Sequence, residues 1–262
     1  MRRSQWLAVT LTPLCLVALL AVQAQAGQVT YPALGNIDPE RGTIEMWLVP
    51  QFDPDADIEG HYRGRRLFLL EQEQEHTFFQ LIWRTRRQDD GSQRSGPWIR
   101  ASNEGEQVVV MARLWHVSGE DDDGWREGEP RHFALSWDGR EMWVTVDGRE
   151  TKREPMRRPL GVQPDADMKI VLGHSGENSF VIHDFRISSL PREPEELGYH
   201  YPDGLRPDPW TLLLDTFREP FEVDGQRQTR PYGLTPSHDQ DGGLPSEGAR
   251  FIETSLGMGL NL

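Results

Sequence analysis

One stretch of the chain restricts its fold more than any other: residues 132–150, HFALSWDGREMWVTVDGRE. Apolar and polar residues alternate on both sides of Asp138-Gly139, and a second pair, Asp147-Gly148, follows nine positions later. Asp-Gly pairs are typical of tight hairpin turns, because glycine accepts the positive φ that these turns require. The alternation places every second side chain on one face. The stretch therefore predicts an antiparallel meander with one face in a hydrophobic core.

Further short apolar runs with strand character occur along the chain, separated by Gly, Pro and Asp. They lie at 42–50, 66–70, 77–84, 107–117, 168–174 and 180–188. The polar sequence EQEQEH between the second and third runs is expected to form a turn. No long segment has helical periodicity, so the pattern favours an all-β antiparallel sandwich or barrel.

The N-terminal segment 1–26 has the features of a secretory signal peptide. Arg2 and Arg3 precede an apolar run at 6–22, and a small-x-small cleavage pattern ends at Ala26. A membrane anchor is the alternative, but the apolar run is short and the cleavage pattern follows it directly. We expect an exported protein that is secreted, periplasmic or held at the cell surface, with no membrane span in the mature chain.

Charge and cysteine content exclude several classes of function. The formal net charge is −14, and it becomes −16 without Arg2 and Arg3. A surface of this charge repels phosphates, so nucleic acid is not an expected partner. Cys15 lies within the signal-like segment. The mature chain then has no thiol, which argues against cysteine-based zinc sites, thiol catalysis and a disulfide-stabilised fold.

Three motifs in this order resemble those of one superfamily. GTIEMWLVP at 42–50 resembles an early strand, RHFALSWDGREMWVTVDG at 131–148 resembles a central hairpin, and 170–193 resembles the closing strand. Together they are similar to laminin-G-like domains of the concanavalin A-like lectin/glucanase superfamily. The resemblance implies an antiparallel jelly-roll sandwich of two sheets, with Trp47 and Trp137 packed inside it. It implies little about activity, because this fold carries lectins, glycosidases, adhesion modules and spacers.

The C-terminal segment 210–262 contains two apolar runs, WTLLLDTF and ARFIETSLGMGLNL. They resemble the opening strands of the same superfamily, yet they follow the closing motif. Either the domain is circularly permuted and these strands complete one sandwich, or they begin a second, truncated domain. A few strands alone bury too little surface to be stable. We therefore expect one domain, 27–262, made of a motif-bearing part at 42–193, a Pro-rich connector at 194–209 and C-terminal strands; a mobile linker with a loose tail is the alternative.

Catalysis is not expected. Glucanases of this superfamily place Glu-x-Asp-x-Glu on one strand, and Glu71, Glu73 and Glu75 have that spacing. However, glutamines separate them in a polar turn, which does not supply the partly desolvated setting that a catalytic carboxylate needs. A glycoside hydrolase remains the enzymatic alternative.

The histidines near the closing strand, His174 and His183, are interpreted as ordinary polar strand positions. His183 and Asp184 are adjacent on a strand, so their side chains face opposite sides and form a poor catalytic pair. Asp184 matches the strand aspartate of the family and is expected to be a structural hydrogen-bond acceptor.

Calcium is the one cofactor considered, because it binds oxygen ligands in acidic loops. The candidate ligands are Asp53, Asp55 and Asp57 after the first strand, and Asp121, Asp122 and Asp123 in the loop after 107–117. The first run lacks the glycine and glutamate of an EF-hand loop, and acidic loops are common in a chain this negative. Solvated loops are therefore favoured over a metal site, and no cofactor is assigned.

Carbohydrate binding depends on exposed aromatic rings, and three tryptophans are candidates for it. Trp98 and Trp125 lie in polar, Gly-rich surroundings, and Trp143 lies on the polar side of the hairpin. Trp83 and Trp115 could be packed or exposed. We interpret the chain as an exported, non-catalytic binding or adhesion module for an extracellular or cell-surface glycan or protein, met through loops or the concave sheet. A structural surface or assembly module without a small ligand is the other alternative.

Overall fold

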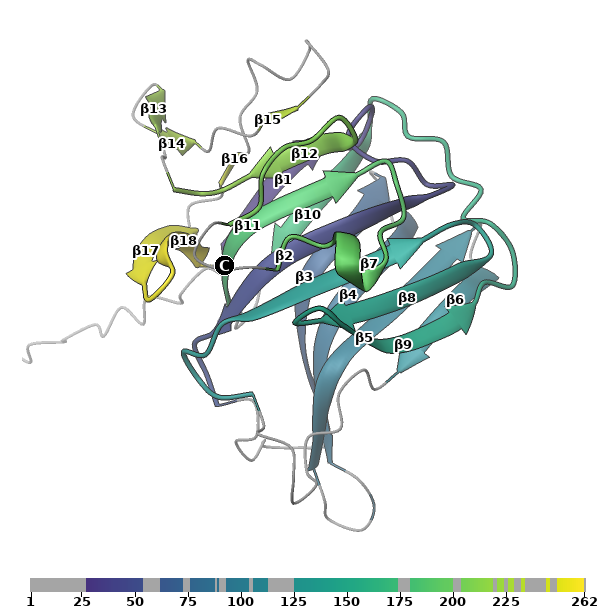
Figure 1. Ribbon diagram of the computed structural model, residues 1–262, viewed down its shortest axis with the longest axis horizontal. Coiled ribbons are helices and arrows are strands. Elements are labelled where there is room, and N and C mark those ends of the chain that lie inside the picture. Colours follow the sequence, from purple (N-terminus) through teal and green to yellow (C-terminus); the bar gives the residue numbers. More distant parts are fainter. Residues whose placement is uncertain are drawn as a thin grey trace, which may run out of the picture.

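The computed structural model describes residues 27–53, 62–72, 76–87, 89, 93–103, 106–112, 125–173, 180–199, 204–218, 221–223, 226–228, 232–233, 244–245 and 249–261. Two antiparallel sheets pack face to face (Figure 1). One short 3-10 helix, η1 (Pro194–Glu196), is the only helix in these ranges. The predicted all-β sandwich is confirmed, whereas the signal-like segment with Cys15 lies outside the described residues.

The first sheet has seven strands, each antiparallel to its neighbours. Its order is β16 (Leu244–Pro245), β1 (Gln28–Pro32), β10 (Met168–Gly173), β3 (Tyr62–Gln72), β4 (His76–Arg87), β5 (Gln93–Asn103) and β6 (Glu106–Ala112). The longest strands, β3, β4 and β5, follow one another in the chain as a meander.

The second sheet has nine strands. Its main order is β15 (Tyr232–Gly233), β12 (Thr211–Asp215), β11 (Phe180–Ser188), β2 (Gly42–Pro50), β7 (Arg131–Trp137), β8 (Glu141–Val146) and β9 (Arg149–Pro155), with β18 (Gly257–Asn261) beside β11 and β17 (Arg250–Thr254) beside β18. A separate small hairpin joins β13 (Phe221–Val223) and β14 (Gln226–Gln228).

The hairpin predicted from residues 132–150 forms β7, β8 and β9. Its first turn has Gly139 at φ 83°, and its second has Asp147 at φ 48° and Gly148 at φ 73°. The carboxylate of Asp138 accepts two backbone N–H groups of its own turn at 2.8 Å each. Positive φ at both central residues of the second turn is the geometry that matches strand twist, which explains the Asp-Gly sequence.

The main core lies between the two sheets and is built from alternate strand residues. The meander contributes Phe133, Leu135, Trp137, Met142, Val144 and Val146 to it, as the alternation predicted. From β2, the core receives Ile44, Met46 and Leu48, while Trp47 and Val49 join a smaller cluster outside that sheet. Trp137 is buried inside the sandwich as expected, whereas Trp47, expected there too, is buried in the smaller outer cluster.

Strand β5 was not predicted, because Gly96, Pro97 and several charged residues interrupt its apolar pattern. It nevertheless pairs with β4 along most of its length, from Phe79 opposite Ala101 to Arg87 opposite Gln93. The expected turn at 71–76 is also shorter than predicted, because residues 71 and 72 continue β3 and β4 begins at residue 76. Charged residues are tolerated here because they alternate with apolar ones that reach the core.

The C-terminal strands complete the nine-stranded sheet. β12 covers one part of the edge of β11, with Phe185 opposite Asp215. β18 covers the remaining part of the same edge, with Ile182 opposite Leu260. Leu213, Phe217 and Leu260 belong to the main core. Of the two accounts that the sequence left open, the structure shows the C-terminal strands in the same sandwich.

Ending the chain after Pro209 should abolish cooperative folding. The truncation exposes the edge of β11 and removes several buried core residues, each worth about 2–5 kcal/mol by the cost of truncating such side chains. Their sum reaches the whole stability of an ordinary domain, about 5–15 kcal/mol. Circular dichroism melts of the full and shortened chains test this. An unchanged, cooperative melting temperature in the shortened chain would contradict it.

Candidate functional site

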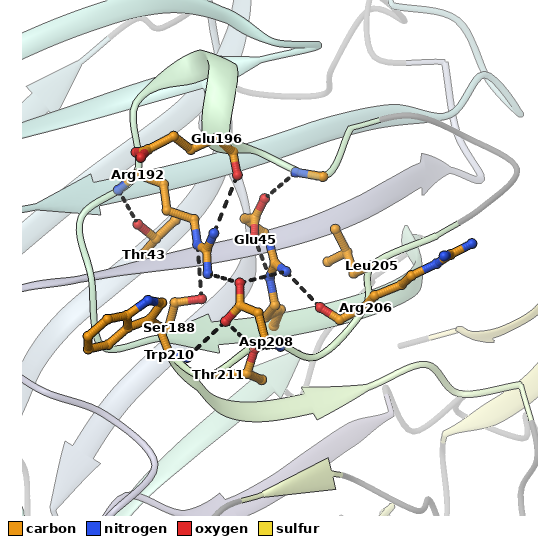
Figure 2. A network of polar contacts seen from close by, with 12 residues as sticks. Thr43, Glu45, Ser188, Arg192, Glu196, Leu205, Arg206, Asp208, Trp210 and Thr211 are labelled. Atoms are coloured by element: carbon orange, nitrogen blue, oxygen red, sulfur yellow. Dashed lines mark hydrogen bonds and ion pairs between the residues drawn. The ribbon is translucent and has the colours of Figure 1, made fainter.

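The outer face of the nine-stranded sheet is polar but buried. Its outward side chains on β2, β7, β8 and β11 include Thr43, Glu45, His132, Ser136, Thr145, Arg186 and Ser188, and all are at most 5% exposed. Buried polar groups are stable only when they find hydrogen-bond partners. Residues 189–199 and 204–210, which we call the strap, lie over this face and supply many of those partners (Figure 2).

The first part of the strap is bound through its backbone. Thr43 Oγ1 donates to the Leu190 carbonyl at 2.8 Å and accepts the Arg192 N–H at 2.9 Å. The Arg192 carbonyl accepts from Ser136 Oγ at 3.0 Å and from Trp143 Nε1 at 3.1 Å. This segment therefore covers the outward face of β2, β7 and β8, and it is not a loose linker.

The second part of the strap surrounds a buried ion pair between Glu45 and Arg186. Arg186 Nε donates to Glu45 Oε2 at 2.6 Å, and the strap adds the Gly198 N–H to Glu45 Oε1 at 3.1 Å. Arg186 Nη1 in turn donates to the Arg206 carbonyl at 2.8 Å. Burial alone would raise the pKa of Glu45, but the His132 side chain, 3.5 Å away, and the Arg186 charge lower it to about 2.

Asp208 fixes the end of the strap. It forms an ion pair with Arg192, and it lies 3.8 Å from Arg186. Its Oδ1 accepts the Trp210 N–H at 2.9 Å and the Thr211 hydroxyl at 3.0 Å. Figure 2 shows these side chains converging from β2, β11 and the strap. In this network, carboxylates and guanidinium groups bind one another. The network is therefore structural, and few of its polar atoms remain available to a substrate or ligand.

His183 and Asp184 have separate structural partners. Asp184 lies at a β-bulge with φ 33°, and its Oδ2 accepts the Leu205 N–H at 3.1 Å and Arg218 Nη2 at 2.8 Å. Burial raises the pKa of Asp184, and Arg218 opposes this. Its predicted role as a structural acceptor is thus confirmed.

The imidazole of His183 contacts the β17–β18 hairpin. Its Nδ1 lies 3.1 Å from the Met258 carbonyl, and its Nε2 lies 2.9 Å from Thr254 Oγ1. Burial lowers the pKa of His183 to about 4, and the Arg218 charge adds to this effect while the Met258 carbonyl opposes it. His174 lies outside the described residues.

Two of the three candidate tryptophans are not exposed. Trp125 belongs to the main core, with its ring centroid 5.0 Å from that of Trp83 and 5.6 Å from that of Phe180. Trp143 lies on the outward side of β8, as the alternation indicated, but the strap leaves it only 2% exposed. The expected exposure of both rings was wrong. The residues that bury them are distant in sequence, so the sequence around each ring does not predict its burial.

Trp98 is the candidate that keeps solvent contact. It is half-buried on β5, at a position that faces away from the main core. The guanidinium carbon of Arg84 lies 4.8 Å from its ring centroid, a cation–π arrangement. Trp83, which the sequence left open, is fully buried in the core, and Trp115 lies outside the described residues.

The surface around Trp98 is the outer face of β10, β3, β4 and β5, which we call the Trp98 face. In register, Arg66 lies opposite Ile82 and Ile82 opposite Trp98, while Leu69 lies opposite Gln80 and Gln80 opposite Arg100. Unlike the face beneath the strap, this one keeps polar groups in solvent. Arg66 is exposed, and Gln80, Arg84, Arg100 and Lys169 are half-buried.

Carboxylates are scarce on the Trp98 face. Glu71 is half-buried on β3 and pairs in register with Lys169, and it is the one acidic residue of β10, β3, β4 and β5. Glu73 and Glu75 lie outside the described residues, so the structure does not show whether the three glutamates share a face.

The predicted calcium ligands fall mostly outside the described residues. Asp53 is exposed beyond the end of β2, whereas Asp55, Asp57, Asp121, Asp122 and Asp123 are not described. Within the described ranges, no three His, Cys, Asp or Glu side chains gather as metal ligands would. The same ranges contain no helix whose length and apolar character would suit a membrane span.

Comparison by sequence with family models and with curated proteins gives no match. Solved structures do resemble the chain. A Bacteroides ovatus protein with a proposed role in carbohydrate binding has a TM-score of 0.50 at 12% identity, and the match covers 84% of this chain but 56% of that one. A SAP-like pentraxin from Limulus polyphemus (TM-score 0.42, 14% identity, 71% and 87% covered) and the galectin LEC-6 from Caenorhabditis elegans (0.31, 14%, 56% and 86%) are also similar. The first of these matches supports the two-sheet antiparallel sandwich described above.

Replacing Trp125 with alanine should destabilise the protein strongly. Truncating a buried tryptophan costs about 3–5 kcal/mol, because a cavity is left in the core. Trp98→Ala, the matched change on the outer face, should cost about 1 kcal/mol, close to the value of its cation–π contact. Urea unfolding of both variants measures the difference. Equal losses would show that the two rings are not packed as described.

The buried His183 should make the protein less stable as the pH falls from 6.5 to 4. Its folded pKa is about 4 against 6.5 for the free side chain, so the unfolded state takes up the proton first. The neutral His183 makes its full contribution to the free energy of unfolding above pH 6.5. As the pH falls from 6.5 to 4, this free energy decreases by up to about 3 kcal/mol. Urea unfolding against pH for the wild type and His183→Gln measures it. Parallel curves between pH 4 and 6.5 would refute the assignment.

Proposed function

We propose that this protein is an exported, non-catalytic carbohydrate-binding module whose glycan lies on the Trp98 face. The observation that carries the proposal is the contrast between the two outer faces. The strap covers polar side chains of the nine-stranded sheet, whereas the Trp98 face presents an indole and several polar side chains to solvent. Aromatic rings flanked by hydrogen-bonding groups suit sugars, which have apolar faces and polar edges.

Three further observations support the proposal. The sheet positions Trp98 on a long, fully paired strand, so the ring is held by a rigid element. The similar Bacteroides ovatus structure has a proposed role in carbohydrate binding. The sequence motifs resemble laminin-G-like domains, a group that includes adhesion modules, and the N-terminal segment resembles an export signal.

The scarcity of carboxylates favours binding over hydrolysis. Glycosidases need a pair of carboxyl groups on either side of the scissile bond. On the four strands of the Trp98 face, Glu71 is the one acidic residue. Within the described strands the outer face therefore holds one carboxylate, which favours holding a glycan over cleaving it.

Replacing Trp98 with alanine should weaken glycan binding at least tenfold while changing the melting temperature little. The test is a thermal-shift and affinity-electrophoresis panel of neutral and acidic polysaccharides. A glycan at one hundred times its dissociation constant adds about 2.7 kcal/mol, or roughly 5 to 10 °C for a domain of this size.

Trp210 provides the matched control, because it is 49% exposed beside β12 on the other sheet. Trp210→Ala removes the same side chain and should leave glycan binding unchanged. Loss of binding in Trp210→Ala but not in Trp98→Ala would place the site on the strap. No response to any glycan would overturn the proposed function, and release of reducing ends during incubation would identify a hydrolase.

A further inference from the structure

The Trp98 face is basic although the chain as a whole is acidic. The chain carries 28 Lys and Arg against 42 Asp and Glu. The strands β10, β3, β4 and β5 reverse this balance, with Glu71 as their only acidic residue. The basic side chains that the structure describes on their outer face are Arg66, Arg84, Arg100 and Lys169, whereas Arg65, opposite Trp83, is buried on the inner face. A solvated sheet face in an acidic protein has no structural need for such an excess of one sign.

The register places several of these charges around the indole. Arg100 lies two residues after Trp98 on β5, so both side chains point to the same face. Arg84 lies two residues after Ile82, the partner of Trp98 on β4, and its guanidinium lies over the ring. Opposite and diagonal neighbours on one face of a sheet lie within reach of long side chains. Arg84 and Arg100 therefore flank Trp98.

Beneath these charges is an apolar floor. Leu69, Ile82 and Val171 occupy outward positions, do not belong to the main core and are 1%, 7% and 4% exposed. Long basic side chains commonly cover such residues with their methylene groups while the charged ends reach solvent. The Trp98 face thus combines a half-buried indole and cationic groups above a buried apolar layer.

This combination matches one class of glycan. We infer that the ligand of the Trp98 face is an acidic polysaccharide, whose carboxylate or sulfate groups bind Arg84 and Arg100 while a sugar ring rests near Trp98. The inference rests on the proposed function and narrows it. A planar guanidinium binds a carboxylate or sulfate through two parallel hydrogen bonds, and the indole under Arg84 limits the orientations that it must lose on binding.

A nucleic acid fits the same charges less well. The protein carries a formal net charge of −14, so beyond this face it repels a densely charged backbone. An acidic polysaccharide has fewer charges per unit length and offers apolar sugar faces to the indole. Double-stranded DNA is therefore the control polyanion in the test.

The experiment measures affinity of the full protein for three groups of ligands. Polygalacturonate and alginate supply carboxylates, dextran sulfate and chondroitin sulfate supply sulfates, and galactan and mannan are neutral. We expect at least tenfold tighter binding to one acidic group than to the neutral glycans, with affinity that falls as salt rises. The comparison of the first two groups distinguishes carboxylate from sulfate recognition.

Charge-removing variants test the residues. Arg84→Gln and Arg100→Gln should each weaken binding to the acidic glycan about tenfold or more, as expected for the loss of a charge-assisted bidentate contact. Arg149→Gln is the control, because Arg149 is exposed on β9 of the other sheet and the net charge changes equally. Its affinity should remain within about twofold of the wild type.

The outcomes separate the inference from the proposed function. Binding of a neutral glycan that needs Trp98 but neither arginine would overturn the inference and keep the proposed function. Equal losses in all three arginine variants, or equally tight binding of DNA, would show a non-specific charge effect and also overturn it. If no glycan of the panel binds, both the inference and the proposed function are refuted.

Discussion

The ion pair between Glu45 and Arg186 determines how one whole side of the molecule is closed. Two charges withdrawn from water are stable only if hydrogen bonds satisfy their remaining donors and acceptors. Neighbouring strands provide the pair itself, with Arg186 opposite Glu45 in the β11–β2 register. The additional partners are backbone groups of Gly198 and Arg206, and both belong to the strap. The strap is therefore part of the sandwich.

This arrangement assigns different roles to the two sheets. The central strands of the nine-stranded sheet, β2, β7, β8 and β11, are buried on both faces, with apolar residues toward the core and polar residues under the strap. The seven-stranded sheet shares the core but keeps polar side chains of its other face in solvent. A rigid, doubly covered sheet can support a partner sheet whose outer surface varies freely, which is how one fold carries many binding functions.

Sequence reasoning predicted the elements whose signals are local. The strands at 42–50 and 180–188 have the predicted bounds, and the Asp-Gly turns form where expected, because alternation and turn chemistry act over a few residues. β5 was missed because Gly96 and Pro97 obscure its alternation. The exposure of residues 143 and 125 was predicted wrongly for another reason. Their burial depends on the strap and on the core rings, and these contacts are not local in sequence.

The candidate site was predictable only in part. Trp98 was identified from its polar, Gly-rich surroundings, although the structure places it on a strand and not in a loop. Its basic neighbours were missed, because Arg84 joins this surface only through the β4–β5 register and Arg100 shares the face only once residues 93–103 are known to form a strand. The negative net charge of the chain also gave no indication of these arginines, because a net charge does not report how charges are distributed between faces.

The strap also has a consequence for the order in which the molecule is built. Its bonds to β2 join residues 147 to 153 positions apart, such as Thr43 with Leu190 and Glu45 with Gly198. Contacts between such distant residues form slowly, because a large loop must close before they contribute. During synthesis, β2 emerges long before Arg186 and the strap exist. The polar side chains of β2 remain hydrated until nearly four-fifths of the chain has been synthesised. The sandwich therefore closes as one of the last steps of folding.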